Sequence, residues 1–417
     1  MLCLQIMANF VLNIMSKSRK SFATHAIHTV RDTEKQHGCV NNGIFQTSTI
    51  IFDTYEEFMF VDKIYSGSAK MNPRQKTYGR NGTDTMFDCQ EAIASLYDGS
   101  FYSKITSCGY SAIVVALNAF CRSGSHILAS DGVYGPTRSF IAKTLARYGV
   151  EHTFYNPTAS SEEIEKLIKP NTSIIYLESP SSLTFETQDI ASIAILAKKH
   201  NIRTIIDNTF YTAYNLNPFQ YGIDVVVEAC TKYLTGHSDI MAGVITFNEE
   251  CANAISGSTR EIGANTTAMN AYYILRGIRT LKTRLDAHQK AVDEVITNIK
   301  THPRIKQILH PSQQSTPGYK FYKSQCKGYG SLFSIILDKK YPDDQMGKFF
   351  NALELCAMGY SWGGYESLAI PFPQNLQQSR SFPLISGENT GVRCYVGLED
   401  ANDISQDLLN SLDLLGK

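Results

Sequence analysis

The sequence has no excess of charge of either sign, because 39 lysine and arginine residues balance 39 aspartate and glutamate residues. Nucleic acids and anionic membrane surfaces attract proteins with a surplus of positive charge. We therefore expect neither as a partner. A chain of 417 residues that is 43% hydrophobic can bury a large core. Chemistry on a small molecule is the better expectation.

Disulfide and metal signatures are also missing. The ten cysteines include no Cys-x-x-Cys pair, and four of them lie in apolar stretches typical of reduced core thiols: Cys108, Cys121, Cys230 and Cys394. This pattern indicates a reducing, cytoplasmic compartment. His25 and His28 have no second ligand pair at suitable spacing, so we expect no metal site.

No nucleotide-binding motif is present. The chain lacks both Gly-x-Gly-x-x-Gly and Gly-x4-Gly-Lys, which argues against nicotinamide and P-loop enzymes. A long apolar run is absent as well. The mildly apolar first fifteen residues are interrupted by Gln5, Asn9 and Asn13 and lack the features of a signal peptide. We expect residues 1–20 to be a disordered extension, unless Met7 or Met15 is the true start.

What the sequence does contain is an alternation of short apolar runs and helical stretches, typical of an α/β domain with a mostly parallel sheet and helices on both faces. It predicts strands at 103–107, 126–130, 151–155, 173–178, 203–207, 224–229 and 242–247. Helices are predicted at 111–121 and 190–199, and one long helix over 267–301.

These patterns suggest four parts of the chain. After the extension, residues 21–84 are rich in Asn, Gly and Ser, and 16–84 as a whole looks poor in regular structure, which is typical of an arm that wraps a partner or serves a site. Residues 85–279 form the large domain. Residues 280–417 are expected to form a smaller α+β domain.

Lys232 is the best candidate for a covalent cofactor anchor. It follows an apolar strand that stops at a Thr-Lys pair beside a Gly-containing turn. Desolvation there favours the neutral amine that nucleophilic chemistry needs. The alternative is a lysine that only extends from a strand end to solvent. A second strand that ends at Asp207, 25 residues earlier, favours the chemical role.

Polar residues close five successive strands, at the sheet edge where α/β proteins bind ligands. The backbone N–H groups that open the helix at Gly109 suit a phosphate, although an ordinary turn is the simpler interpretation of that glycine alone. Tyr134 alone suggests packing, and Asp207 alone suggests a helix cap. The remaining two ends are Glu178 and Thr231-Lys232. Together they suit pyridoxal 5'-phosphate (PLP), whose pyridine nitrogen an aspartate would keep protonated.

The chain resembles the Cys/Met-metabolism family of fold-type I PLP enzymes, and within it the bacterial cystathionine β-lyase branch. The resemblance runs from about Asn41 to Leu412. Its motifs are Tyr78-Gly-Arg80, Glu178-Ser-Pro180, Asp207-Asn-Thr209, Thr231-Lys-Tyr-Leu-Thr-Gly-His-Ser-Asp239, Tyr360-Ser-Trp-Gly-Gly-Tyr-Glu-Ser-Leu368 and Arg393-Cys-Tyr-Val-Gly-Leu-Glu-Asp400.

The resemblance implies a role for each site residue. Lys232 anchors PLP and moves protons, and Asp207 pairs with the pyridine nitrogen. The ring of Tyr134 stacks on the cofactor. The phosphate is held by Gly109, Tyr110 and Thr231, and by Tyr78 and Arg80 of a neighbouring subunit. Tyr134 and Tyr78 join Lys232 as expected catalytic residues.

Arg393 is expected to bind the substrate α-carboxylate, a task that suits a planar guanidinium. Tyr360, Ser361 and Trp362 line the same region. The implied assembly is a homotetramer of dimers with shared sites.

The implied reaction is β-elimination of L-cystathionine to homocysteine, pyruvate and ammonia, a step of methionine biosynthesis. Cysteine or cystine cleavage is a possible further activity. Tyr360-Ser-Trp362 resembles the β-lyases, since γ-enzymes usually have Ser-Leu there, and Pro136 stands where methionine γ-lyases have a cysteine. A γ-lyase or γ-synthase stays open as an alternative. A non-catalytic binding protein would not need Lys232, Asp207, Tyr134 and Arg393 together.

One departure from the family concerns the phosphate site. Relatives usually place a serine three residues before the lysine, where this chain has Ala229. A lost hydrogen bond to a charged group costs roughly 1.5–3 kcal/mol if nothing replaces it. We therefore predict that Ala229→Ser tightens PLP binding. Titration of the unloaded protein with PLP measures this, and equal or weaker affinity would contradict it.

Overall fold

The large domain is built on a seven-stranded sheet with the order β1-β7-β6-β5-β4-β2-β3 in a computed structural model that describes residues 20–65, 72–373, 380–385 and 387–416. Its strands are β1 (Tyr102–Thr106), β2 (His126–Ser130), β3 (Glu151–Tyr155), β4 (Thr172–Glu178), β5 (Arg203–Asp207), β6 (Val225–Glu228) and β7 (Gly243–Phe247). All seven predicted strands are confirmed within two residues. Six of the strands run in the same direction, and β7 is antiparallel to both of its neighbours.

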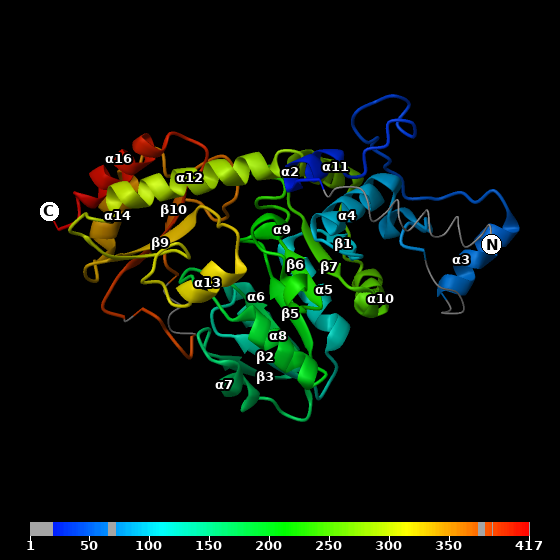
Figure 1. The fold of residues 1–417 in the computed structure, drawn as a ribbon, viewed down its shortest axis with the longest axis horizontal. Coiled ribbons are helices and arrows are strands. Elements are labelled where there is room, and N and C mark those ends of the chain that lie inside the picture. Colours follow the sequence, from blue (N-terminus) through cyan, green and yellow to red (C-terminus); the bar gives the residue numbers. More distant parts are fainter. Residues whose placement is uncertain (1–19, 66–71, 374–379, 386, 417) are drawn as a thin grey trace.

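The sheet is apolar on both sides because its strands are buried between two layers of helices (Figure 1). Alternate residues of β4 enter different cores. Ile174 packs with α5 (Gly109–Phe120), whereas Ile175 packs with α4 (Asp84–Leu96) and α8 (Ile190–Lys199). Full burial of one such side chain stabilises the fold by roughly 1.5–3 kcal/mol. The continuous apolar strands therefore fix the predicted fold class, a mostly parallel sheet with helices on both faces.

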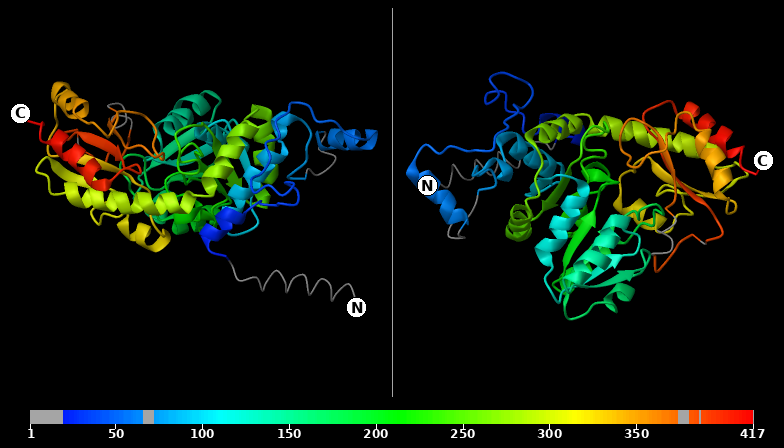
Figure 2. Two further views of the ribbon diagram at one scale, coloured as in Figure 1. Left: turned by 90° about the horizontal axis from the view of Figure 1, so that it is seen from above. Right: turned by 180° about the vertical axis from the view of Figure 1, so that it is seen from behind.

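A smaller antiparallel sheet follows, in the order β10-β11-β9-β8. Its strands are β8 (Ile305–Leu309), β9 (Leu332–Leu337), β10 (Leu368–Pro371) and β11 (Gly391–Tyr395). Helices α12 (Leu281–Ile299), α14 (Asp343–Asn351) and α16 (Ala401–Leu412) pack around it, as expected of an α+β unit. Figure 2 shows α12 running from the large sheet to this smaller one.

The long helix predicted over 267–301 is wrong, because the structure has two helices there. The first is α11 (Ala268–Ile278), and α12 begins at Leu281. Thr280 leaves the helical region, with φ −111° and ψ 5°. The guanidinium of Arg279 donates to the carbonyl oxygens of Ala26 and Thr29, at 2.8 and 2.9 Å. These tertiary bonds hold the break against α2 (Phe22–His28).

The arm contains more helix than the sequence predicts. Besides α2 it forms α3 (Tyr55–Tyr65) and the short η1 (Gly79–Asn81), and the rest of its described residues are irregular. Figures 1 and 2 show α3 projecting away from the body of the chain. The predicted disordered extension lies almost entirely outside the described residues. None of the described helices has the length and apolar character needed to span a membrane.

The remaining short elements connect these layers. They are α6 (Gly135–Ser139), η2 (Phe140–Leu145), α7 (Ser161–Glu165), α9 (Thr212–Asn215), η3 (Pro218–Tyr221), η4 (Glu249–Cys251), α10 (Ala252–Ile262) and α13 (Tyr319–Gln325).

Two helical glycines give a matched test of this packing. A Cβ on Gly277 in α11 would lie 2.2 Å from the carbonyl oxygen of Leu234, whereas a Cβ on Gly257 in α10 meets nothing within 4 Å. We expect Gly277→Ala to destabilise the protein by roughly 1–3 kcal/mol. Gly257→Ala should be neutral or stabilise it by up to about 1 kcal/mol. Urea denaturation of both variants measures the difference, and equal midpoints would contradict it.

Candidate active site

The candidate site lies at the carboxyl ends of the central parallel strands. Glu178 at the end of β4 and Asp207 at the end of β5 are directly paired in the sheet register. Lys232 lies four residues beyond the end of β6. Tyr134 follows β2 and precedes α6. The parallel register therefore gathers four of the five polar strand ends at one edge, as the sequence predicts.

Lys232 points toward the smaller sheet. Its Nζ donates to Ser361 Oγ at 2.5 Å and lies 5.3 Å from the centroid of the Trp362 ring. Burial lowers the pKa of Lys232 to about 8, and the positive charge of Arg393 adds to the effect, while Asp207 and Glu366 oppose it. The loop around the lysine is tightly packed, since a Cβ on Gly363 would lie 2.8 Å from Lys232 Cα.

Asp207 is held by a turn and does not cap a helix. Its Oδ1 accepts hydrogen bonds from the backbone N–H and the hydroxyl of Thr209, at 3.0 and 2.5 Å. Its other oxygen has no hydrogen bond among the described residues. Burial raises the pKa of Asp207, and the Thr209 hydrogen bonds and the Lys232 charge oppose this rise. A protonated ring nitrogen would supply both a donor and a positive charge at this carboxylate.

Tyr134 is hydrogen-bonded to the half-buried carboxyl group of Glu178. Its backbone N–H donates to Glu178 Oε2 at 2.6 Å, and 45% of the residue is exposed. Burial raises the pKa of the Tyr134 hydroxyl, and the charges of Glu178 and Asp207 add to the rise, which Arg393 opposes. Burial and the adjacent Asp207 raise the pKa of Glu178 well above its ordinary value. Glu178 thus fixes the backbone that carries the aromatic ring, a role that its motif alone does not reveal.

The expected phosphate cradle has the required close approach at Gly109. A Cβ there would lie 2.5 Å from the Cβ of Ala229, so only glycine fits where α5 begins. Gly109 and Tyr110 are the first two residues of this 12-residue helix and present backbone N–H groups. Thr231 lies beside them, but its hydroxyl donates to the carbonyl oxygen of Ala242 at 3.1 Å.

Arg393 reaches the site from the central strand β11. Its Nη2 donates to the carbonyl oxygen of Ser361 at 2.9 Å, and its buried Nε has no hydrogen-bond partner. Burial lowers the pKa of this guanidinium to about 10, so it stays charged at neutral pH. An orphaned buried donor on a cation suits a carboxylate ligand. Tyr360, by contrast, is 85% exposed at the rim.

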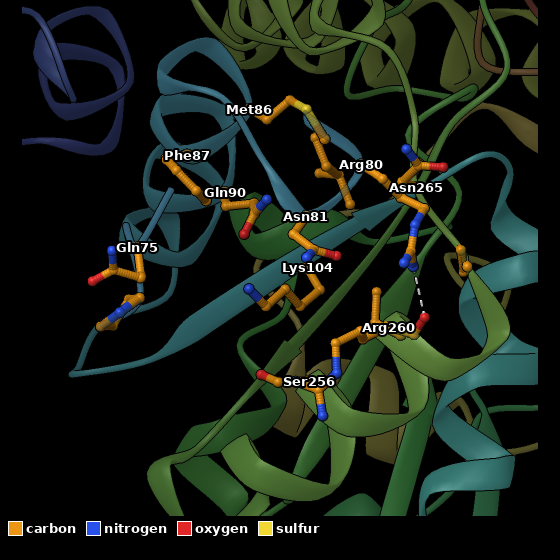
Figure 3. Close-up of a pocket in the computed structure, with 15 residues that line it drawn as sticks. Gln75, Arg80, Asn81, Met86, Phe87, Gln90, Lys104, Ser256, Arg260 and Asn265 are labelled. Atoms are coloured by element: carbon orange, nitrogen blue, oxygen red, sulfur yellow. Dashed lines mark hydrogen bonds between the residues drawn. The ribbon is translucent and has the colours of Figure 1, made fainter. Parts of the chain in front are cut away.

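Among the described residues, neither Tyr78 nor Arg80 forms a hydrogen bond with Lys232, Asp207 or Tyr134. Tyr78 is 47% exposed. Arg80 Nη1 donates to the carbonyl oxygen of Arg260, a residue of α10, at 2.8 Å (Figure 3). Within a single chain the structure therefore does not bring them to Lys232.

Sequence reasoning missed Glu228, although it closes β6 as Glu178 closes β4. Its carboxyl group is fully buried and accepts a hydrogen bond from Tyr97 at 2.5 Å. Burial raises the pKa of Glu228 to about 8, so the group is largely protonated at neutral pH. The sequence signal that could have found Glu228 is an acidic residue at the end of an apolar strand, the same signal that pointed to Asp207.

The residues present fit PLP: a lysine with lowered pKa, a half-buried carboxylate with one open oxygen and a glycine-opened helix end. Fold and site together define a fold-type I PLP-dependent enzyme. The chain belongs to the Cys/Met metabolism PLP-dependent enzyme family, whose model matches residues 23–413. The resemblance, the fold class and the cofactor are thereby confirmed.

Relatives in this family have different reactions. The chain is 34% identical to an L-alanine/L-glutamate racemase of Wolbachia pipientis wMel, over 89% of this chain and 92% of that protein. It is 32% identical to cystathionine beta-lyase of Escherichia coli K12, over 93% and 97%. A crystal structure of cystathionine gamma-lyase from Lactobacillus plantarum, complexed with L-serine, matches with TM-score 0.83 at 27% identity, over 95% of this chain and 99% of that one. The family includes carbon–sulfur lyases.

The lowered pKa of Lys232 predicts how pH controls covalent loading of PLP. Loading needs the neutral amine, so its rate should rise with pH and level off above about 8. Visible absorbance after mixing PLP with the unloaded protein measures this rate. A free lysine analogue is the control, and its rate should keep rising toward pH 10.5, the ordinary lysine value. The same continued rise in the protein would contradict the prediction.

Proposed function

We propose that this enzyme cleaves L-cystathionine by β-elimination, releasing homocysteine, pyruvate and ammonia. One observation carries the proposal: the anchor candidate Lys232 contacts Ser361 and lies beside Trp362, while Arg393 binds the Ser361 carbonyl. The Tyr360-Ser-Trp segment that resembles the β-lyases thus lies against the reactive amine. The reaction would serve methionine biosynthesis, and cysteine or cystine is a further substrate candidate.

In the proposed mechanism Lys232 would hold the cofactor until the substrate amine takes its place, which leaves the lysine amine free. PLP supplies an electron sink for the charge that develops at the substrate Cα. The freed Lys232 amine, with its lowered pKa, takes the Cα proton. The C–S bond at Cβ then breaks, and the sulfur leaves with the bonding electrons. The Lys232 ammonium returns a proton to that sulfur, which leaves as the thiol of homocysteine.

The other site residues position the cofactor. Asp207 would keep the pyridine nitrogen protonated, and Tyr134 would stack on the ring from a backbone that Glu178 fixes. Gly109, Tyr110 and Thr231 would hold the phosphate, and the Thr231 hydroxyl would have to turn away from Ala242 to do so.

Arg393 would bind the α-carboxylate, and its Nε is a buried donor that the protein leaves unpaired. Trp362 and Ser361 shape the space beside the leaving sulfur. Tyr360 closes the rim.

Racemisation is a second candidate, favoured by the similarity to the Wolbachia racemase. Both reactions begin when Lys232 removes the Cα proton. Racemisation then needs a proton returned to the opposite face, and we assign that role to the hydroxyl of Tyr134. The γ-lyase alternative is supported by the similarity to the Lactobacillus plantarum structure. Against it stand Trp362 and Pro136.

We further propose that two chains share each site, with dimers pairing into a tetramer. The arm exposes several large apolar side chains: Val40, Ile44, Phe45, Ile51, Tyr55, Phe58 and Phe60. Such a surface is typical of a subunit interface. Tyr78 and Arg80 would then reach the neighbour's phosphate site.

We assign residues 21–84 to this arm, 85–279 to the PLP-binding domain and 280–417 to the C-terminal domain. The nine described cysteines are free thiols, which suits the proposed cytoplasmic location. Cell fractionation tests that location, and recovery outside the cytoplasm would contradict it.

The products decide between these reactions. With L-cystathionine the purified enzyme should release pyruvate and homocysteine, and Lys232→Ala should reduce turnover by several orders of magnitude. Release of 2-oxobutyrate and cysteine would instead select a γ-lyase. Formation of D-alanine from L-alanine, without keto acid, would select the racemase. An active Lys232→Ala variant would overturn the mechanism.

The same variant tests the shared site. Lys232→Ala and Arg80→Ala subunits, each nearly inactive alone, should regain up to about a quarter of wild-type activity when refolded together. Only a hybrid dimer contains one site with both native residues, which is the basis of this estimate. Each variant refolded alone is the control. No recovery in a mixture that forms hybrids, measured by tagged pull-down, would contradict the sharing.

A further inference from the structure

Glu228 ends the strand β6 four residues before Lys232, and its carboxyl group belongs to a buried hydrogen-bond network. Only 2% of the residue is exposed. The hydroxyl of Tyr97 donates to Glu228 Oε1 at 2.5 Å, and the same hydroxyl oxygen accepts from Asn208 Nδ2 at 3.3 Å. Tyr97 follows α4 and Asn208 follows β5, so the network joins three elements of the large domain.

Two buried acceptor atoms of this network have no hydrogen-bond partner among the described residues, Glu228 Oε2 and Asn208 Oδ1. The Asn208 amide cannot turn over to change this, because its Nδ2 donates to the carbonyl oxygen of Leu216 at 3.1 Å. Buried polar atoms normally have partners, since an unpaired one costs free energy. A carboxylate has only acceptors, whereas a carboxylic acid has one donor. A proton on Glu228 Oε2 therefore supplies a donor where the network lacks one.

The network lies against the turn that carries Asp207. Asn208 is the next residue of that turn. The backbone N–H of Ala229, the residue after Glu228, donates to Thr209 Oγ1 at 2.9 Å, and this hydroxyl donates to Asp207 Oδ1 at 2.5 Å. A displacement of Glu228 would therefore disturb the hydrogen bonds that orient the Asp207 carboxylate.

We propose that Glu228 is a positioning residue that acts as a neutral acid: it holds Tyr97 and Asn208 together and thereby fixes the orientation of Asp207 toward the pyridine nitrogen. The proposal rests on the role proposed above for Asp207. Glu228 and Asp207 end the adjacent strands β6 and β5. A second negative charge there would compete with Asp207 for the protonated ring, and a neutral Glu228 avoids that competition.

The titratable groups around Glu228 are consistent with its neutral form. Burial raises the pKa of Glu228 to about 8. The hydrogen bond from Tyr97 opposes this rise, and the negative charge of Asp207 adds to it. Two thiols also lie close, Cys89 and Cys230, and burial raises the pKa of each, so neither adds a charge at neutral pH.

Thermal unfolding of the PLP-loaded enzyme tests the proton on Glu228. In the unfolded chain a glutamate loses its proton near pH 4.5, whereas folded Glu228 keeps it up to about pH 8, so folding loses stability as pH rises through this window. Glu228→Gln has no such proton. Between about pH 5 and 8 its melting temperature should therefore rise relative to the wild type by about 2 °C or more. A constant difference would mean that Glu228 is ionised and paired with buried water, which would overturn the proposal.

Turnover and the visible absorbance of bound PLP, followed against pH, test the positioning role. Glu228→Gln keeps an acceptor for Tyr97 and a donor, so it should retain kcat within about twofold and the same absorbance profile. Glu228→Met has neither group and should lower kcat about tenfold, leave KM within about twofold and shift the profile. Thr246→Val is the control for lost stability, because it removes a buried hydrogen bond with Ser103 in the same sheet. It should change neither turnover nor absorbance.

Asp207→Asn separates this proposal from the proposed function. Wild-type turnover and absorbance in that variant would mean that the role of Asp207 is wrong, and both proposals would fall. If Asp207→Asn loses both while Glu228→Met behaves like Thr246→Val, only the positioning role is wrong. A Glu228→Gln enzyme as impaired as Glu228→Met would show that Glu228 acts as an anion, which also contradicts the proposal.

Should Glu228→Met fail to fold, Tyr97→Phe carries the test. It removes the hydroxyl but keeps the ring that packs edge-on against Phe219, with the centroids 5.2 Å apart. We expect it to lower kcat about threefold or more and to shift the same absorbance profile. Unchanged turnover and absorbance in this variant would overturn the proposal.

Discussion

The site depends on the interaction between a lysine, Lys232, and a carboxylate, Asp207, which both lose hydration at the edge of a buried sheet. Lys232 and Asp207 each lose hydration, and each opposes the pKa shift that burial imposes on the other. In this environment charge interactions are stronger than in water, so small displacements change protonation. Glu178 lies beside Asp207 in the sheet. Burial and the negative charge of Asp207 raise the pKa of Glu178, which favours its neutral form. The parallel register of β4 and β5 makes this arrangement unavoidable.

The smaller sheet contributes site residues that the large sheet lacks. The large sheet contributes an amine and acids, but the cation that faces the substrate comes from β11, and Ser361 comes from the loop before β10. Both depend on how α12 places the smaller sheet. The break at Thr280 sets the direction of α12, and Arg279 fixes that break to α2. Gly277 allows α11 to contact the backbone of the loop that carries Lys232. The short segment 277–280 thus connects the arm, the loop that carries Lys232 and the smaller sheet.

The features that could be predicted from the sequence are those determined by residues close together in the chain. Apolar β-branched runs closed by a polar residue gave every strand of the large sheet, together with Lys232 and Asp207. It failed where tertiary contacts decide, as at the helix break, since the hydrogen bonds of Arg279 join residues about 250 apart. The contact of Lys232 with Ser361 spans 129 residues. No local pattern encodes it, so Ser361 and Arg393 entered only through the resemblance. Glu228 was missed although its local signal was present.

Comparison of Lys232 with Lys104 separates what burial does from what partners do. Burial lowers the pKa of both lysines to about 8, and a nearby arginine acts in the same direction on each. Only Lys232 has a hydroxyl within hydrogen-bonding distance and two carboxylates that oppose the shift. A lowered lysine pKa by itself therefore does not identify a nucleophile. Lys232 differs because a hydroxyl and two carboxylates surround it, beside the other residues that fit PLP.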